Sequence, residues 1–123
     1  MLADRTVKTN SHTALFPYFN CVKALAEYRR GHWKDAVHFA AEALNSATPV
    51  LARDAQAGAI LAMAKYRLGS PLTAREALAK AKALMPESLL VAGKIPPEFD
   101  GDWHDLLIAQ VLVREANRVL ELE

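Results

Sequence analysis

The sequence predicts an all-α domain of about five helices. Hydrophobic residues make up 52% of the 123-residue chain, and many of them are alanine and leucine, whereas aromatic residues make up only 7%. Alanine favours helix and lets neighbouring backbones approach closely. Apolar residues also recur three and four positions apart, which is typical of one helix face. In addition, one glycine-broken stretch of the chain is repeated 38 residues later.

Charge and composition limit the classes of function. The 15 basic and 14 acidic residues leave a formal charge of +1, so we expect no nucleic-acid partner. No apolar run is long enough for a membrane span, and none at the N-terminus is long enough for a signal peptide. Cys21 is the lone cysteine and lies in an apolar pattern, which indicates a buried, inert thiol. We therefore predict a cytoplasmic protein without a cofactor.

The first two helices are expected after a flexible segment at 1–13, within a single domain at 14–123. Pro17 suits the first turn of a helix, because its missing N–H has no partner there. This helix should end at Gly31, since glycine adopts a left-handed backbone readily. Its apolar face carries Cys21, Ala24, Leu25 and Tyr28. A second helix then starts at Trp33 and runs through "WKDAVHFAAEALNSA".

Two further helices begin at the same kind of signal. Thr48-Pro49 and Ser70-Pro71 each place a capping hydroxyl before a proline at the first helical position. The sequence thus predicts a third helix over 49–68 that ends at Gly69. A fourth helix should continue to Met85.

The last third of the chain contains a proline-rich loop and one long helix. Residues 86–101 hold three prolines and two glycines among apolar residues, so we expect a loop that packs onto the domain. A closing helix is predicted over 102–121, with Asp102 as its cap and Asp105 completing a capping box. This helix is apolar on more than one side, which indicates cover on two faces or burial in a dimer.

The duplication explains why a good helix is broken at a glycine. With an offset of 38, eight pairs of identical or similar residues coincide: Ala24 and Ala62, Leu25 and Met63, Ala26 and Ala64, Tyr28 and Tyr66, Arg29 and Arg67, Gly31 and Gly69, Ala36 and Ala74, Ala43 and Ala81. Two helices joined at a glycine turn, and then repeated, indicate a stack of helical hairpins. Neither hairpin buries its apolar face alone, so the stack is the stable unit.

These hairpins resemble the tetratricopeptide repeat, with repeat one over 17–46, repeat two over 49–85 and a closing helix. The first helix of each repeat carries the spacing that ends in Tyr28 or Tyr66, and the second carries alanines such as Ala36 and Ala74. The chain departs from the pattern in its period of 38 residues. It also has Leu25 and Met63 where the family has a small residue.

A narrower resemblance concerns the two ends of the domain. "ALAEYRRG" and "DWHDLLIA" are similar to the C-terminal repeat tail of bacterial serine/threonine kinases and related signalling proteins. This resemblance implies a bacterial signalling context. It implies no kinase activity, because the chain has no Gly-rich loop, no H-R-D and no D-F-G.

The resemblance to tetratricopeptide repeats implies a concave groove lined by the first helix of each repeat. The residues expected to line it are Phe19, Val22, Ala26, Arg29, Ala57, Ile60, Ala64, Arg67, His104, Ile108 and Val111. Its apolar floor and its two arginines would bind a protein or peptide segment with an acidic group. Alternatively, residues 86–101, the N-terminal segment or a second copy of the chain fills the groove.

Two other functions stay open. The closing helix would support a homodimer, which makes the domain a structural module. An enzyme or small-ligand binder would use Trp103, His104 and Asp105, because a histidine beside a carboxylate can act as a general base. The four histidines show no metal-ligand spacing, so we expect no metal site. We favour a non-catalytic interaction module over an enzyme.

Overall fold

The computed structural model describes residues 16–46, 50–85 and 103–120, and all of its regular structure is α-helical. No strand occurs in these ranges, so the predicted all-α class is confirmed for them. The helices are α2 (Phe16–Arg29), α3 (Trp33–Leu44), α4 (Leu51–Arg67), α5 (Pro71–Leu84) and α7 (Trp103–Leu120). The segment at 1–13, the Thr48-Pro49 cap, the loop at 86–101 and the Asp102 cap lie outside the described residues.

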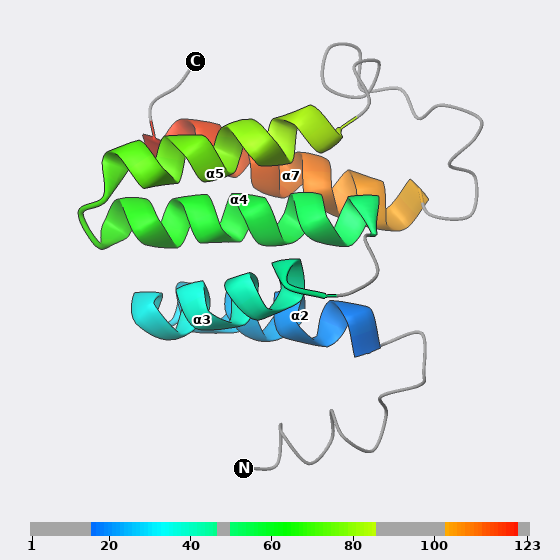
Figure 1. Cartoon of the computed structure of the whole chain (residues 1–123), viewed down its shortest axis with the longest axis horizontal. Coiled ribbons are helices and arrows are strands. Elements are labelled where there is room, and N and C mark those ends of the chain that lie inside the picture. The colour runs from blue at the N-terminus through cyan, green and yellow to red at the C-terminus, as the bar shows by residue number, and fades with distance from the viewer. Residues whose placement is uncertain (1–15, 47–49, 86–102, 121–123) are drawn as a thin grey trace.

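The helices form two antiparallel hairpins and a closing helix (Figure 1). The chain runs in one direction through α2, α4 and α7, and in the opposite direction through α3 and α5. None of the described helices combines the length and the apolar character that a membrane span requires.

Glycine ends the first helix of each hairpin, as predicted. Gly31 and Gly69 have φ values of 82° and 88°, in the left-handed region. After α2, the His32 amide donates to the Glu27 carbonyl and the Gly31 amide donates to the Tyr28 carbonyl. The same two bonds recur after α4, from the amides of residues 70 and 69. This pair of bonds is the Schellman motif, which satisfies the last carbonyls of a helix.

The starts of α4 and α5 agree less well with the sequence. Ser70 is the N-cap of α5 and Pro71 is its first residue, but the Ser70 hydroxyl makes no capping hydrogen bond. The third helix was predicted to start at about Pro49, and α4 begins two residues later, at Leu51. Val50 is the N-cap there, with an extended backbone, and its carbonyl accepts the Asp54 amide.

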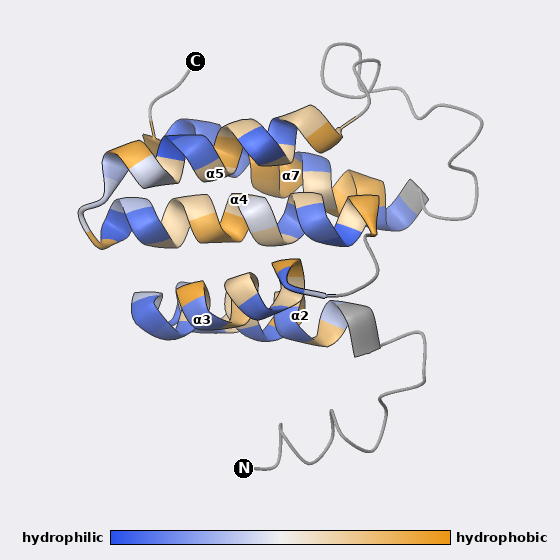
Figure 2. Ribbon diagram, viewed as in Figure 1, coloured by the Kyte–Doolittle hydropathy of each residue, from blue (hydrophilic) through white to orange (hydrophobic). Residues whose placement is uncertain are grey.

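Helix α4 lies at the centre of the molecule. It packs against α2, α3, α5 and α7, and it is buried on several sides. Its many alanines make this possible, because small side chains let four neighbours approach one helix. Figure 2 shows hydrophobic and hydrophilic residues mixed along it. The buried Arg53 forms an ion pair with Asp54, with 2.8 Å between the nitrogen and the oxygen.

Alanine seams hold the helices of each hairpin together, as the duplication predicts. The equivalent pairs Ala36 and Ala74, and Ala43 and Ala81, are all buried. Helices α4 and α5 approach closely at Gly58, where an added Cβ would lie 2.9 Å from the Ala81 Cβ.

The closing helix α7 packs on the second hairpin differently from the way α4 packs on the first. Against the hairpin that precedes it, α4 packs more on the second helix, α3, than on α2, whereas α7 packs more on the first helix, α4, than on α5. The Gln56 side-chain amide donates to the Asp105 carbonyl at 3.0 Å, which joins the start of α7 to α4. The packing of α7 on the second hairpin therefore differs from the packing of the second hairpin on the first.

Candidate functional site

An ion pair between α2 and α7 organises the best candidate surface. The Arg29 guanidinium donates two hydrogen bonds to the Glu115 carboxylate, one of them at 2.7 Å. A two-bond contact of this kind fixes orientation as well as distance. Helices α2 and α7 run in the same direction (Figure 1), and this pair joins the last residue of α2 to α7.

Exposed aliphatic side chains lie on the same faces of both helices. Val22 and Ile108 each precede the ion-paired residue by seven positions, which is about two helical turns. Val22 is 67% exposed, Ile108 is 47% exposed and Val111 is 60% exposed. We define the α2/α7 face as Val22, Arg29, Ile108, Val111 and Glu115.

The expected floor of the groove is not accessible. Ile60 is 1% exposed, and Ala57 and Ala64 are fully buried. All three lie on α4, where the neighbouring helices cover them. The prediction that Ile60 lines an open groove is therefore wrong. The alanines of α4 let the helix pack closely with its neighbours.

The two predicted arginines do lie together. Arg29 and Arg67 line one shallow cavity with Tyr28, Gly31, Trp33 and Glu115. The Arg67 Nε donates to the Tyr28 hydroxyl at 3.3 Å. The hydrogen bond from Arg29 lowers the pKa of Glu115, and the charges of Arg118 and Arg67 lower it further. One carboxylate thus lies among three guanidinium groups.

Two other residues that were predicted to line the groove, Phe19 and His104, lie outside the α2/α7 face as defined. Phe19 is half-buried on α2, and His104 is exposed in the first turn of α7. Sequence reasoning missed Glu115, although it follows Ile108 by seven positions on the same face of α7. On α2, Arg29 likewise follows Val22 by seven positions. The helical spacing alone therefore placed Arg29 and Glu115 on the same helix faces as the predicted groove residues Val22 and Ile108.

For the alternative around Trp103, His104 and Asp105, the structure gives little support. Asp105 is half-buried, and its backbone carbonyl accepts the Gln56 bond that joins α4 to α7. The Trp103 side chain lies outside the described residues. This hydrogen bond positions the start of α7.

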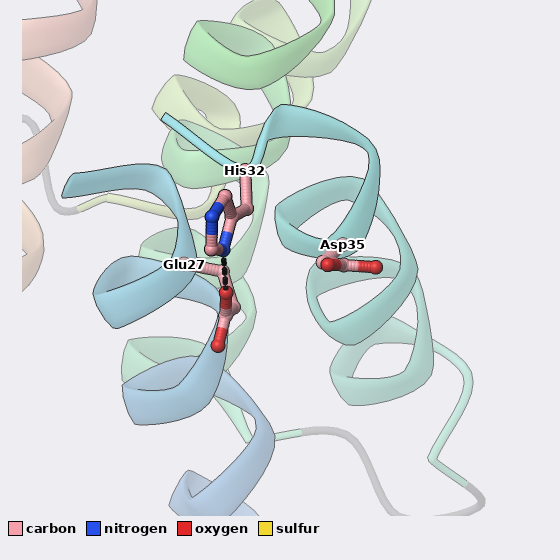
Figure 3. A group of neighbouring side chains, drawn as sticks. All are labelled: Glu27, His32 and Asp35. Atoms are coloured by element: carbon pink, nitrogen blue, oxygen red, sulfur yellow. Dashed lines mark hydrogen bonds and ion pairs between the residues drawn. The ribbon is translucent and has the colours of Figure 1, made fainter. Parts of the chain in front are cut away.

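The turn between α2 and α3 gathers a second group of polar side chains (Figure 3). The buried Glu27 carboxylate lies 2.7 Å from the His32 Nδ1, 2.9 Å from the Lys23 Nζ and 3.5 Å from an Arg30 nitrogen. Hydrogen bonds, first from Lys23 and then from His32, lower the pKa of Glu27. Asp35 lies close by, in the first turn of α3.

Comparisons of the chain with known protein families, with curated proteins and with solved structures found no match.

Proposed function

We propose that this chain is a non-catalytic protein-interaction module, which binds a segment of a partner protein on the α2/α7 face. The observation that carries the proposal is the exposure of Val22, Ile108 and Val111 beside an arginine-rich cavity. Aliphatic side chains gathered beside charged groups are typical of peptide-binding surfaces.

We also propose that the domain is a tetratricopeptide-like stack. Two features support this: the paired hairpins at an offset of 38 residues, and the same Schellman bonds after α2 and α4. Packing of α7 mainly on α4 departs from a regular stack. The bacterial signalling context rests on sequence resemblance alone.

The partner segment would supply an aliphatic residue and an acidic group. Val22, Ile108 and Val111 offer apolar contact, and Arg67 offers an exposed guanidinium. Arg29 is already bonded to Glu115, so it contributes less to binding than Arg67. Because α4 fills the space beneath, the segment would lie across the surface of α2 and α7 rather than enter a deep groove.

Selection of peptides tests this proposal without knowledge of the natural partner. Peptides that bind the wild-type chain would be selected from a random display library, and their affinities compared among variants. We expect Ile108→Asp to weaken the selected peptides about tenfold or more, since it places a charge in an apolar contact. Arg67→Ala should weaken the acidic peptides alone.

Leu72→Asp is the matched control, because Leu72 is 75% exposed on α5, outside the α2/α7 face. This variant should bind as the wild type does. Equal affinity of all variants for the selected peptides would refute the assignment of the face. Circular dichroism would establish that each variant retains its helical content.

Self-association is the second candidate function, favoured by the exposed Ile108 and Val111 on α7. Sedimentation of the same proteins separates it from peptide binding. A concentration-dependent dimer that Ile108→Asp abolishes would assign the face to a second copy of the chain. A monomer at high concentration would reject that assignment.

A further inference from the structure

The turn between α2 and α3 brings three potential metal ligands together. Glu27, His32 and Asp35 each offer an atom, and these atoms all lie within 4.8 Å of one another. Figure 3 shows Glu27 at the end of α2 and His32 in the turn meeting at a hydrogen bond, with Asp35 to one side at the start of α3. No other group of this kind occurs among the described residues.

The Schellman motif fixes two of the three positions. The His32 amide donates to the Glu27 carbonyl at 2.9 Å, which holds the two residues on one side of the turn. The Glu27 side chain is buried, whereas His32 and Asp35 are exposed. The group therefore has one rigid member and two members that solvent and ions can reach.

The second hairpin shows that the fold does not require this group. It makes the same turn with the same backbone bonds, yet it has different side chains at the equivalent positions. Those positions hold Lys65, Ser70 and Thr73. The polar trio is thus specific to the first turn, and helix termination does not explain it.

Each oxygen of Glu27 has a separate role. Oε2 lies 2.9 Å from the Lys23 Nζ, and Oε1 lies 2.7 Å from the His32 Nδ1. Because an ionised carboxylate only accepts hydrogen bonds, Nδ1 is the donor of the second contact. The Asp35 side chain makes no hydrogen bond or ion pair with another described residue.

We propose that Glu27 Oε1, His32 Nδ1 and the Asp35 carboxylate bind a divalent transition-metal ion such as Zn²⁺. In the metal-bound form the imidazole is neutral with its proton on Nε2, and the proton that Nδ1 donates to Glu27 in the free chain is exchanged through water. One imidazole nitrogen and two carboxylate oxygens suit zinc and its neighbours better than Ca²⁺ or Mg²⁺, which prefer oxygen ligands alone. Water would complete the coordination. This site is separate from the α2/α7 face, and it does not depend on the proposed function.

The geometry requires only small movements. Ligands about 2.1 Å from a tetrahedral zinc ion lie about 3.4 Å from each other. Oε1 and Nδ1 are 2.7 Å apart, so they must separate slightly, and Asp35 must close from within 4.8 Å. Rotation of the exposed His32 and Asp35 side chains supplies both movements.

Neighbouring cations set the affinity. Lys23 and Arg30 both contact Glu27, so their charges oppose an incoming cation. Arg30 is the weaker obstacle, because its contact is longer and its side chain is exposed. The Lys23 Nζ would stay in contact with Glu27 Oε2 while Oε1 binds the metal. We therefore expect a dissociation constant in the micromolar range rather than the tight binding of a structural zinc site.

Titration calorimetry with ZnCl₂ tests the proposal on the full chain. We expect one ion per chain, with binding weakened about 10- to 100-fold or more in Asp35→Asn and in His32→Gln. Asp35 is exposed and unpaired among the described residues, so Asp35→Asn should not disturb folding. Circular dichroism checks this for both variants.

His38→Gln and Glu42→Gln are the matched controls, because both residues are exposed on α3 but outside the trio. Both should bind Zn²⁺ as the wild type does. The proposal would be overturned by the absence of a binding heat at millimolar Zn²⁺. Equal affinity of Asp35→Asn and the wild type, or loss of binding in His38→Gln alone, would also overturn it.

Discussion

At the residue scale, burial decides the chemistry of Cys21. The thiol lies within the packed interface of α2 with α4, and its sulfur donates to the Arg53 carbonyl at 3.4 Å. Desolvation by burial raises its pKa to about 12. Because the thiolate is the reactive form of cysteine, the native thiol should be inert at mildly alkaline pH.

We therefore expect iodoacetamide to modify Cys21 slowly in the folded chain and quickly in denaturant. Mass spectrometry of the intact protein would follow both reactions. Equal rates of modification in the two conditions would show that this interface opens readily in solution.

The sequence predicted single residues well where one local constraint decides their conformation. Gly31 and Gly69 end α2 and α4 with positive φ, because few other residues adopt that backbone without cost. It predicted Ile60 badly, since exposure depends on which helices cover α4. It did not predict the group around Glu27 either, because the spacing of Glu27, His32 and Asp35 does not match H-E-x-x-H or a Cys/His cluster.

At the scale of elements, the alanine seams set how closely helices pack. Ala74 is fully buried on α5, whereas Ala79 on the same helix is exposed. Ala74→Leu should lower the free energy of unfolding by about 1–3 kcal/mol, because the added atoms have no space. Ala79→Leu should change it by less than about 0.5 kcal/mol. Urea denaturation of both variants measures the difference.

The same contrast is available in the first hairpin, with the buried Ala36 and the exposed Ala41 on α3. If the hairpins are equivalent, Ala36→Leu should be destabilising and Ala41→Leu close to neutral. Similar stabilities for the buried and exposed variants would contradict the assigned seams.

At the scale of the whole molecule, the Arg29–Glu115 pair joins the first described helix to the last. The pKa of Glu115 is lowered from its ordinary value of 4.5 by the hydrogen bond from Arg29. A carboxyl group whose pKa is lowered in the folded state stabilises the fold at any pH above its pKa in the unfolded chain. That stability is lost as the pH falls through the pKa of the folded state. The pair should thus stabilise the fold at neutral pH and fail in acid.

Comparison of the wild type with Glu115→Gln isolates this contribution. At neutral pH the variant should be less stable by about 0.5–1 kcal/mol, a small value because Arg29 is half exposed. The difference should shrink as pH falls below 4.5. Glu27, whose pKa is also lowered, is present in both proteins, so its effect cancels. Denaturant titrations over a range of pH would measure the difference.

Glu42→Gln is the control for this experiment, since Glu42 is an exposed carboxylate on α3. Its stability should follow that of the wild type at each pH. A difference between the wild type and Glu115→Gln that stays constant from neutral to acid pH would contradict a role for the charge.

The sequence by itself determined the helices, their glycine turns and their alanine seams, because these depend on backbone preference and on spacing along one segment. It also placed Arg29 and Arg67 at equivalent positions, and they line one cavity. Only the tertiary structure decided that α4 is enclosed and that α7 packs mainly on α4. The pairing of Arg29 with Glu115 and the gathering of Glu27, His32 and Asp35 were decided there too. The physical reason is that packing between segments sets burial and long-range pairing, and spacing within one helix does not.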